Sequence, residues 1–200
     1  MKKQNTPVDT VPCAVCSTPT PHYHIVHYGS TDGGYRDLCT RCFNADVAAR
    51  NRLDHFENIQ FDKVMLADCT GQKHEFHFRT RLLGDIVTLE AFELHDGAPG
   101  GYEFQIIGKP RDELMSLLAR LIERMRRSLS VKHLKQDKHG RGIADMTVRA
   151  KISSNYGQGE GEPMLVIDGH DVSWAEFGRM LLTFEGWQFR MQIADRSEEI

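Results

Sequence analysis

No apolar run in this 200-residue chain approaches the roughly 18 residues that a membrane-spanning helix needs. The first ten residues, MKKQNTPVDT, hold two lysines with no apolar stretch behind them, which does not fit a secretory signal. A composition of 40% hydrophobic and 26% charged residues excludes a disordered or fibrous chain. We therefore expect a folded, cytoplasmic protein that has no membrane partner.

Motifs of the common catalytic folds are also missing. The chain has no GxSxG, no Walker phosphate loop and no Rossmann glycine pattern, and its glycine-rich run GQGEGE is acidic, which would repel phosphate. Two groups could still take part in catalysis, namely His74 with His77, and Asp168 with His170 and Asp171. On a strand the two histidines face opposite sides, however, and Asp168-Gly169 is typical of a turn. An enzyme of unknown type is therefore our third hypothesis, behind two binding functions.

The first 58 positions have few aliphatic residues and contain four of the five cysteines. Cys13 and Cys16 form one CxxC pair, and Cys39 and Cys42 form a second pair after 22 intervening residues. Zinc binds four thiolates tetrahedrally, and each CxxC turn supplies two of them. Two disulfides or redox dithiols are the alternative, which a cytoplasmic location disfavours. We predict a structural zinc ion with these four ligands and no open coordination position, and we expect the fifth cysteine, Cys69, to be a small buried residue.

The segments around the cysteine pairs add a second signal. YHIVHYG and GYRDL predict a hairpin between the pairs, and FNADVAARNRL after Cys42 predicts a helix. This order of knuckle, hairpin, knuckle and helix resembles the treble-clef and zinc-ribbon class of zinc folds over residues 13–53. The resemblance implies a metal but leaves the function open, because such modules bind nucleic acids, bind proteins or support enzymes. A histidine in place of one cysteine is the alternative ligand set, drawn from His22, His24 and His27.

The chain as a whole is predicted to be an α+β protein, in which a zinc module (1–58) precedes mostly antiparallel sheets that are each covered by a helix. The unit 59–140 holds predicted strands in FDKVMLA, HEFHFRTRLL, IVTLEAFEL and YEFQIIG. A two-residue turn at Gly84-Asp85 fixes their register. It pairs Leu82 with Val87, Phe78 with Ala91, and Arg79 with Glu90. Even positions from 76 to 82 then face the core, and Arg79 and Arg81 lie on a wetter face.

A long basic amphipathic helix is predicted over 111–135, with Pro110 at its start. Its apolar stripe consists of Leu114, Leu118, Leu121, Met125 and Leu129. Residues 109–151 hold 12 basic and 5 acidic residues, a net charge of +7, whereas 152–200 carry a net charge of -6. The basic band therefore either binds an anionic partner or docks on acidic segments of its own fold.

The unit 141–200 is predicted to combine strands with one helix. Residues 146–152 alternate as a half-buried strand, and the Gly-rich stretch after them is predicted to be a loop. A capping box at Ser173–Glu176 starts a helix that reaches about Phe184. WQFRMQI (187–193) is the predicted final strand. The segment SWAEFGRMLLTFEGWQFRMQI also resembles bacterial proteins, some of them plasmid-borne, which implies no activity.

We interpret the chain as a non-enzymatic regulatory or adaptor protein that carries structural zinc and binds another protein. The alternative is nucleic-acid binding through the zinc module and the basic helix. Its candidate residues are Arg41, Arg50, Arg120, Arg124, Arg127, Lys132 and Lys135. A homo-oligomer formed through the long helix is a further alternative, although an apolar stripe of only about three heptads is short for a coiled coil.

Overall fold

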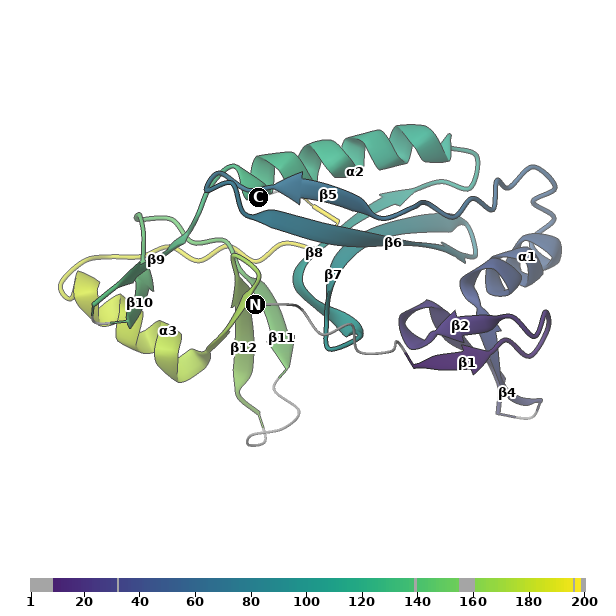
Figure 1. The fold of residues 1–200 in the computed structure, drawn as a ribbon, viewed down its shortest axis with the longest axis horizontal. Coiled ribbons are helices and arrows are strands. Elements are labelled where there is room, and N and C mark those ends of the chain that lie inside the picture. The colour runs from purple at the N-terminus through teal and green to yellow at the C-terminus, as the bar shows by residue number, and fades with distance from the viewer. Residues whose placement is uncertain (1–8, 32, 139, 155–160, 196, 199–200) are drawn as a thin grey trace.

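A four-stranded antiparallel sheet, ordered β5-β6-β7-β8, lies at the centre of the computed structural model (Figure 1). The strands are β5 (Val64–Ala67), β6 (Lys73–Leu83), β7 (Ile86–His95) and β8 (Ala98–Gly108). The helix α2 (Leu114–Leu129) covers one face, the cysteine-containing module lies at one end and a small mixed unit lies at the other. The structure describes residues 9–31, 33–138, 140–154, 161–195 and 197–198, and its fold is α+β. None of the helices in these ranges has the length and apolar character that crossing a bilayer requires.

The register predicted for the central hairpin is confirmed. Leu82 pairs with Val87, Phe78 with Ala91, and Arg79 with Glu90. Gly84 has a φ of +69°, the left-handed conformation that a two-residue hairpin turn demands. Phe76, Phe78 and Leu82 are buried against α2 because the side chains of a strand alternate between its two faces.

The helix α2 is shorter than the predicted span 111–135. It begins four residues after Pro110, and the Asp112 carboxylate accepts a hydrogen bond from the Lys109 N–H (2.8 Å) in a turn that precedes the helix. At the other end the Ser130 hydroxyl donates to the Arg127 carbonyl (2.7 Å), where the chain leaves the helix. The buried stripe is made of Leu114, Leu117, Leu121, Met125 and Leu129, while Leu118 is half-buried. Lys132 therefore lies beyond the helix.

The N-terminal module has the predicted hairpin and helix. The hairpin consists of β3 (Ile25–Ser30) and β4 (Gly34–Cys39), and α1 (Thr40–Arg50) follows directly. A short pair, β1 (Thr10–Pro12) with β2 (Pro19–Pro21), flanks the first two cysteines. His22 to His24 form a single 3-10 turn, η1 (His22–His24), so the hairpin strand predicted from YHIVHYG begins only at Ile25.

The buried side chains of this module share one apolar cluster with the central sheet. Leu38, Phe43 and Val47 belong to the same cluster as Phe78 and α2. The scarcity of aliphatic residues in the module is thus compensated by packing against the sheet as well as by the cysteines. Burying each large apolar side chain stabilises the fold by about 1.5–3 kcal/mol.

The second face of the sheet is drier than the sequence predicts. Glu90 is only 1% exposed, and it accepts hydrogen bonds from Arg79 (2.6 Å) and Arg81 (3.0 Å). Arg79 also donates to the main-chain oxygen of Tyr23 (2.6 Å), and the Tyr23 ring lies edge-on to Phe92. Because η1 covers this face, the two arginines serve as ion-pair partners inside the protein instead of lying in solvent.

The remaining unit has its own small core. Its elements are β9 (Leu134–Asp137), β10 (Gly140–Ile143), β11 (Lys151–Ser154), β12 (Pro163–Ile167), β13 (His170–Ser173), α3 (Trp174–Leu181) and η2 (Leu182–Phe184). The strands form a β9-β10 hairpin and a three-stranded sheet ordered β11-β12-β13. The predicted helix cap is confirmed, because the Ser173 hydroxyl accepts from the Glu176 N–H (3.1 Å).

Two strand predictions in this unit are wrong. Residues 187–193 form no strand, and Trp187, Phe189, Met191 and Ile193 are 66%, 76%, 58% and 72% exposed. Residues 146–150 are also outside any strand, since β11 covers only the end of the predicted segment. Alternating apolar and polar residues favour an extended backbone, but a strand also needs a neighbouring strand with which to form hydrogen bonds. The predicted loop falls mostly on residues 155–160, which are outside the described residues.

Candidate metal centre

The two CxxC pairs meet in space. The Sγ atoms of the four cysteines all lie within 4.8 Å of one another; these residues are Cys13, Cys16, Cys39 and Cys42. The Sγ atoms of Cys16 and Cys39 are 3.8 Å apart. Cys13 and Cys39 are buried, Cys42 is half-buried and Cys16 is exposed, so the cluster lies at the edge of the core with one ligand toward solvent.

Local backbone geometry places each pair. The Ser17 N–H donates to the Cys13 carbonyl (2.8 Å), and Ser17 adopts a left-handed φ of +58°, which closes the first knuckle. Cys39 is the N-cap of α1, and its sulfur accepts from the Cys42 N–H (3.4 Å). The two knuckles are joined directly because the Cys39 N–H donates to the Cys13 sulfur (3.2 Å).

The surroundings lower the pKa of the two cysteines of the first pair and raise the pKa of the two cysteines of the second pair. Burial works to raise the pKa of Cys13, but backbone N–H groups of Cys16, Cys39 and Val15 lower it to about 6. Burial and the neighbouring cysteines raise the pKa of Cys42 instead. Four thiolates this close repel one another, so a bound cation is what would allow all of them to ionise together.

The donor set fits zinc. Four sulfur ligands at mutual contact, with N–H···S hydrogen bonds behind two of them, are the arrangement of a structural tetrathiolate site. Cys13, Cys16, Cys39 and Cys42 would hold the ion, and such an ion supplies folding free energy without an open position for a substrate.

The histidine alternatives lie outside this cluster, which contains no histidine from the described part of the chain. His22 is 3.4 Å from Asp9, and His27 pairs with Asp37. The Nδ1 atom of His24 is buried, and its main-chain oxygen accepts from the Thr40 hydroxyl (2.9 Å). The side chains of His22 and His27 are therefore paired with carboxylates and not with the sulfurs.

Cys69 is exposed, so the prediction that it is buried is wrong. Its N–H donates to the carbonyl of Leu129 (2.9 Å), which fixes the backbone at the end of α2 and leaves the thiol outside the core.

The basic residues proposed for nucleic acid are spread over the molecule. Four of them contact their own chain. Arg50 pairs with Asp46 (2.6 Å), Arg127 pairs with Glu123 (3.2 Å), Lys132 pairs with Asp68 (2.7 Å) and Arg124 donates to main-chain carbonyls. Arg41, Arg120 and Lys135 are exposed and form no ion pair with the described residues. These three lie on α1, on α2 and on β9.

His74 and His77 lie on opposite faces of β6, as predicted. His74 is buried between two carboxylates, with Nδ1 2.9 Å from Glu93 and Nε2 3.2 Å from Asp68. Lys132 completes this network by pairing with Asp68. Burial works to raise the pKa of Asp68, but its contacts with Lys132, Thr70 and His74 hold that pKa far below its usual range. This network is not evident from the sequence, because its members come from separate elements.

The Asp168 group is a turn, as predicted. Asp168 and Gly169 have φ values of +51° and +76° between β12 and β13. The Asp168 carboxylate accepts from the N–H groups of His133 and Leu134, both at 2.7 Å. His170 and Asp171 are exposed on β13, so the three side chains do not converge on one point.

Three protein-family profiles match successive parts of the chain. They are Domain of unknown function (DUF7685) over residues 12–54, Domain of unknown function (DUF7686) over residues 57–130 and Domain of unknown function (DUF7713) over residues 133–198. The first match encloses all four clustered cysteines. No curated protein and no solved structure gives a significant match.

Proposed function

We propose that this chain is a non-enzymatic adaptor or regulatory protein, in which a structural zinc ion of the treble-clef type supports a body that binds another protein. The observation that carries the proposal is the row of apolar side chains on the segment 187–193. Trp187, Phe189, Met191 and Ile193 are each more than half exposed.

Exposure of this kind is costly unless a partner covers it. Scattered apolar residues are ordinary on a protein surface, but four large exposed ones within seven residues concentrate apolar surface on one short segment. Burying each would contribute about 1.5–3 kcal/mol. Trp, Phe and Met are also the side chains enriched at protein interfaces.

The zinc module has a supporting role in this proposal. Its helix α1 packs on β6 and its turn η1 packs on the other side of the sheet, so a bound ion would stabilise the sheet as well as the module. A tetrathiolate shell leaves no position for a substrate, which fits a structural role better than a catalytic one.

Nucleic-acid binding is the competing function. Phosphate contacts need cations gathered on one surface, and Arg50, Arg124 and Lys132 are already engaged within the protein. A titration of the intact protein with DNA and RNA at two salt concentrations tests it. Affinity that falls steeply with salt would favour nucleic acid over our proposal, and we expect no saturable binding.

The direct test is photo-crosslinking in the cells from which the chain comes. A photoreactive phenylalanine analogue replaces Phe189 in one protein and Tyr35 in a matched control, because Tyr35 is 67% exposed and lies on β4 in the zinc module. We expect a discrete protein adduct from position 189 and none of the same mass from position 35. Identical adduct patterns, or no adduct from position 189, would refute binding through this segment.

A further inference from the structure

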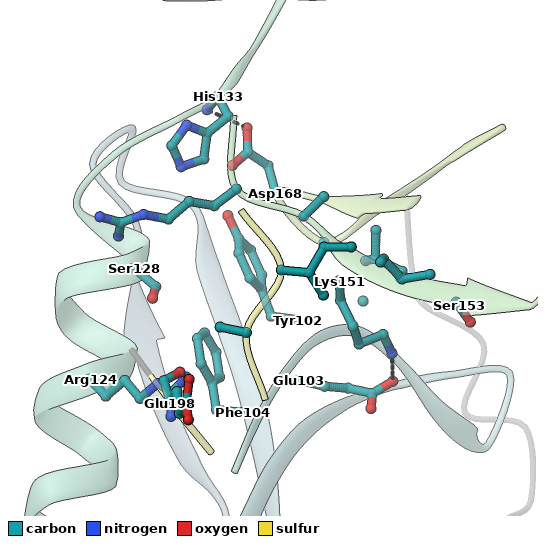
Figure 2. Close-up of a pocket in the computed structure, with 18 of the residues that line it drawn as sticks. Tyr102, Glu103, Phe104, Arg124, Ser128, His133, Lys151, Ser153, Asp168 and Glu198 are labelled. Carbon is teal, nitrogen blue, oxygen red and sulfur yellow. Dashed lines mark hydrogen bonds and ion pairs between the residues drawn. The ribbon is translucent and has the colours of Figure 1, made fainter. Parts of the chain in front are cut away.

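A cavity of about 500 Å³ lies where β8, α2, β11 and the C-terminal segment meet (Figure 2). Its volume falls within the roughly 300–1,000 Å³ typical of ligand sites. Figure 2 shows Tyr102 and Phe104 projecting from β8, Arg124 and Ser128 from α2, and Lys151 from β11. The cavity is therefore built from the central sheet and the C-terminal unit together.

Two strand edges border this cavity. β8 is the outermost strand of the central sheet, and β11 is the outermost strand of the three-stranded sheet. Residues 101–104 of β8 line one side, and residues 149–153, which include most of β11, line another. An outer strand carries N–H and C=O groups on the side that lacks a neighbour, and these groups can pair with an added extended peptide.

The chain already places an extended segment of its own here. Arg124 donates to the main-chain oxygens of Gln105 (2.9 Å) and Ser197 (2.9 Å), and it also donates to the oxygen of Glu198. Residues 192–195 line the cavity, and the segment runs from α3 past the ends of β11 and β12 toward α2 (Figure 1). Because Arg124 contacts main-chain oxygens, this contact does not depend on which side chains the segment carries.

The lining favours an apolar segment over a charged ligand. With the chain's own Asp195 and Glu198 displaced, the cations Arg124, Arg149 and Lys151 face the anions Glu103 and Asp168, so the excess is a single positive charge. Lys151 pairs with Glu103, and Asp168 accepts two backbone N–H groups. The rings of Tyr102 and Phe104 lie 6.0 Å apart and within 9° of parallel, which gives one wall an aromatic surface.

We propose that this cavity is a groove for an extended, apolar peptide segment of a partner protein, which takes the place of the chain's own residues 192–195 and 197–198. This inference rests on the proposed function and names the place where the partner binds. The chain's own segment then acts as a resident ligand that the partner displaces, and displacement leaves Trp187 and Phe189 able to contact that partner as well.

The test uses the full chain with a site-specific protease sequence inserted between Glu185 and Gly186, beyond η2. The folded protein is cut, and a fluorescein-labelled peptide with the sequence of residues 187–198 is added while its anisotropy is measured. We expect saturable binding to the cut protein. Binding to the uncut protein should be at least about tenfold weaker, because the attached segment competes at high effective concentration.

Two arginine variants test the position of the peptide. Arg124→Ala should weaken peptide binding by at least about tenfold, since it removes charge-assisted hydrogen bonds to main-chain oxygens. Arg120→Ala, one turn earlier and exposed, is the matched control and should bind as the parent does. If Arg124→Ala does not fold, Arg124→Lys keeps the charge but not the planar fork, and it should weaken binding several-fold.

Absence of saturable binding to the cut protein, or equal affinities for the Arg124 and Arg120 variants, would overturn the groove. Equal affinities for cut and uncut protein would place the peptide elsewhere and would overturn it too. Crosslinking at position 189 is measured independently of this titration. A crosslink at position 189 without peptide binding would therefore contradict only the proposed groove. Peptide binding without a crosslink would contradict the proposal that a partner protein binds through residues 187–193.

Discussion

The side-chain amide of Asn44 is paired with the main chain of Leu82, in the place that a neighbouring strand would occupy. Its Oδ1 accepts from the Leu82 N–H and its Nδ2 donates to the Thr80 carbonyl, both at 2.9 Å. β5 pairs only with residues 73–76 of β6, so the rest of that edge would otherwise have no partner. Asn44 is 1% exposed and lies two residues after Cys42, so it connects the cysteine cluster to the sheet.

Asn44→Ala should destabilise the protein by about 2–4 kcal/mol, because it leaves a buried N–H and a buried carbonyl of β6 without their partner. Urea unfolding followed by circular dichroism measures this loss. Asn51→Ala is the control, since the side-chain amide of Asn51 donates to the Val47 carbonyl at the end of α1, and it should cost about 1 kcal/mol or less. Equal losses for the two variants would contradict a special role for Asn44.

Zinc content should depend on the clustered cysteines and not on the fifth. The wild-type protein and Cys69→Ser should each retain a single zinc ion by elemental analysis, whereas Cys13→Ser should lose it. Removal of an ion whose binding contributes on the order of 10–16 kcal/mol should unfold the module. Hydrogen exchange then offers a sensitive readout, because the Leu82 amide should lose protection together with α1. A metal-free protein with a protected Leu82 amide would contradict this coupling.

The hairpin around Gly84 is predictable residue by residue because everything that fixes it is local. The turn length sets the register, and the alternation of Phe76, Phe78 and Leu82 sets the buried face. The four cysteines are predictable for a similar reason, since zinc chemistry constrains their number and spacing. Local patterns of this kind gave correct predictions for the Gly84 hairpin and the cysteine cluster, but not for the burial of Cys69 or the exposure of Arg79.

Features that depend on distant neighbours were not predictable. Glu90 and Arg79 look like a solvent-facing pair until η1 is placed over them. The alternation of apolar and polar residues over 187–193 predicts a strand, but no local signal tells whether another strand lies beside this segment. The groove likewise joins β8 to β11 and Arg124 to Ser197, pairs that are far apart in sequence.

Asp68→Asn should destabilise the fold by about 3–5 kcal/mol, because it leaves the Lys132 ammonium without its counter-charge and disturbs the hydrogen bond to His74. The Asp68 carboxylate is fully buried and contacts both Lys132 (2.7 Å) and His74 (3.2 Å). Its pKa is depressed in the folded protein, so its contribution is present at neutral pH and is lost as the pH falls below the ordinary value of about 3.9. Asp62→Asn, at an exposed position, is the control and should change the free energy of unfolding by less than about 0.5 kcal/mol. Equal effects at the two positions would contradict the role assigned to the network.

His24 should make the protein less stable as the pH falls from neutral. Burial, with the nearby charges of Arg79 and His77, lowers the pKa of His24 to about 4, and its buried Nδ1 atom has no hydrogen-bond partner in the described part of the chain. The unfolded chain, with an ordinary histidine pKa of about 6.5, binds a proton first. Stability is therefore complete above about pH 6.5 and declines toward pH 4 by up to about 1.4 kcal/mol per pH unit.

His24→Phe removes this titration while keeping a ring of similar size. Urea unfolding between about pH 7.5 and pH 5 should show a shallower decline for this variant than for the wild type, while the exposed control His55→Phe should follow the wild type. Protonation of the cysteines affects all three proteins alike, so it cancels in the comparison. Parallel profiles for His24→Phe and wild type would mean that the His24 ring takes up its proton as readily in the folded protein as in the unfolded chain.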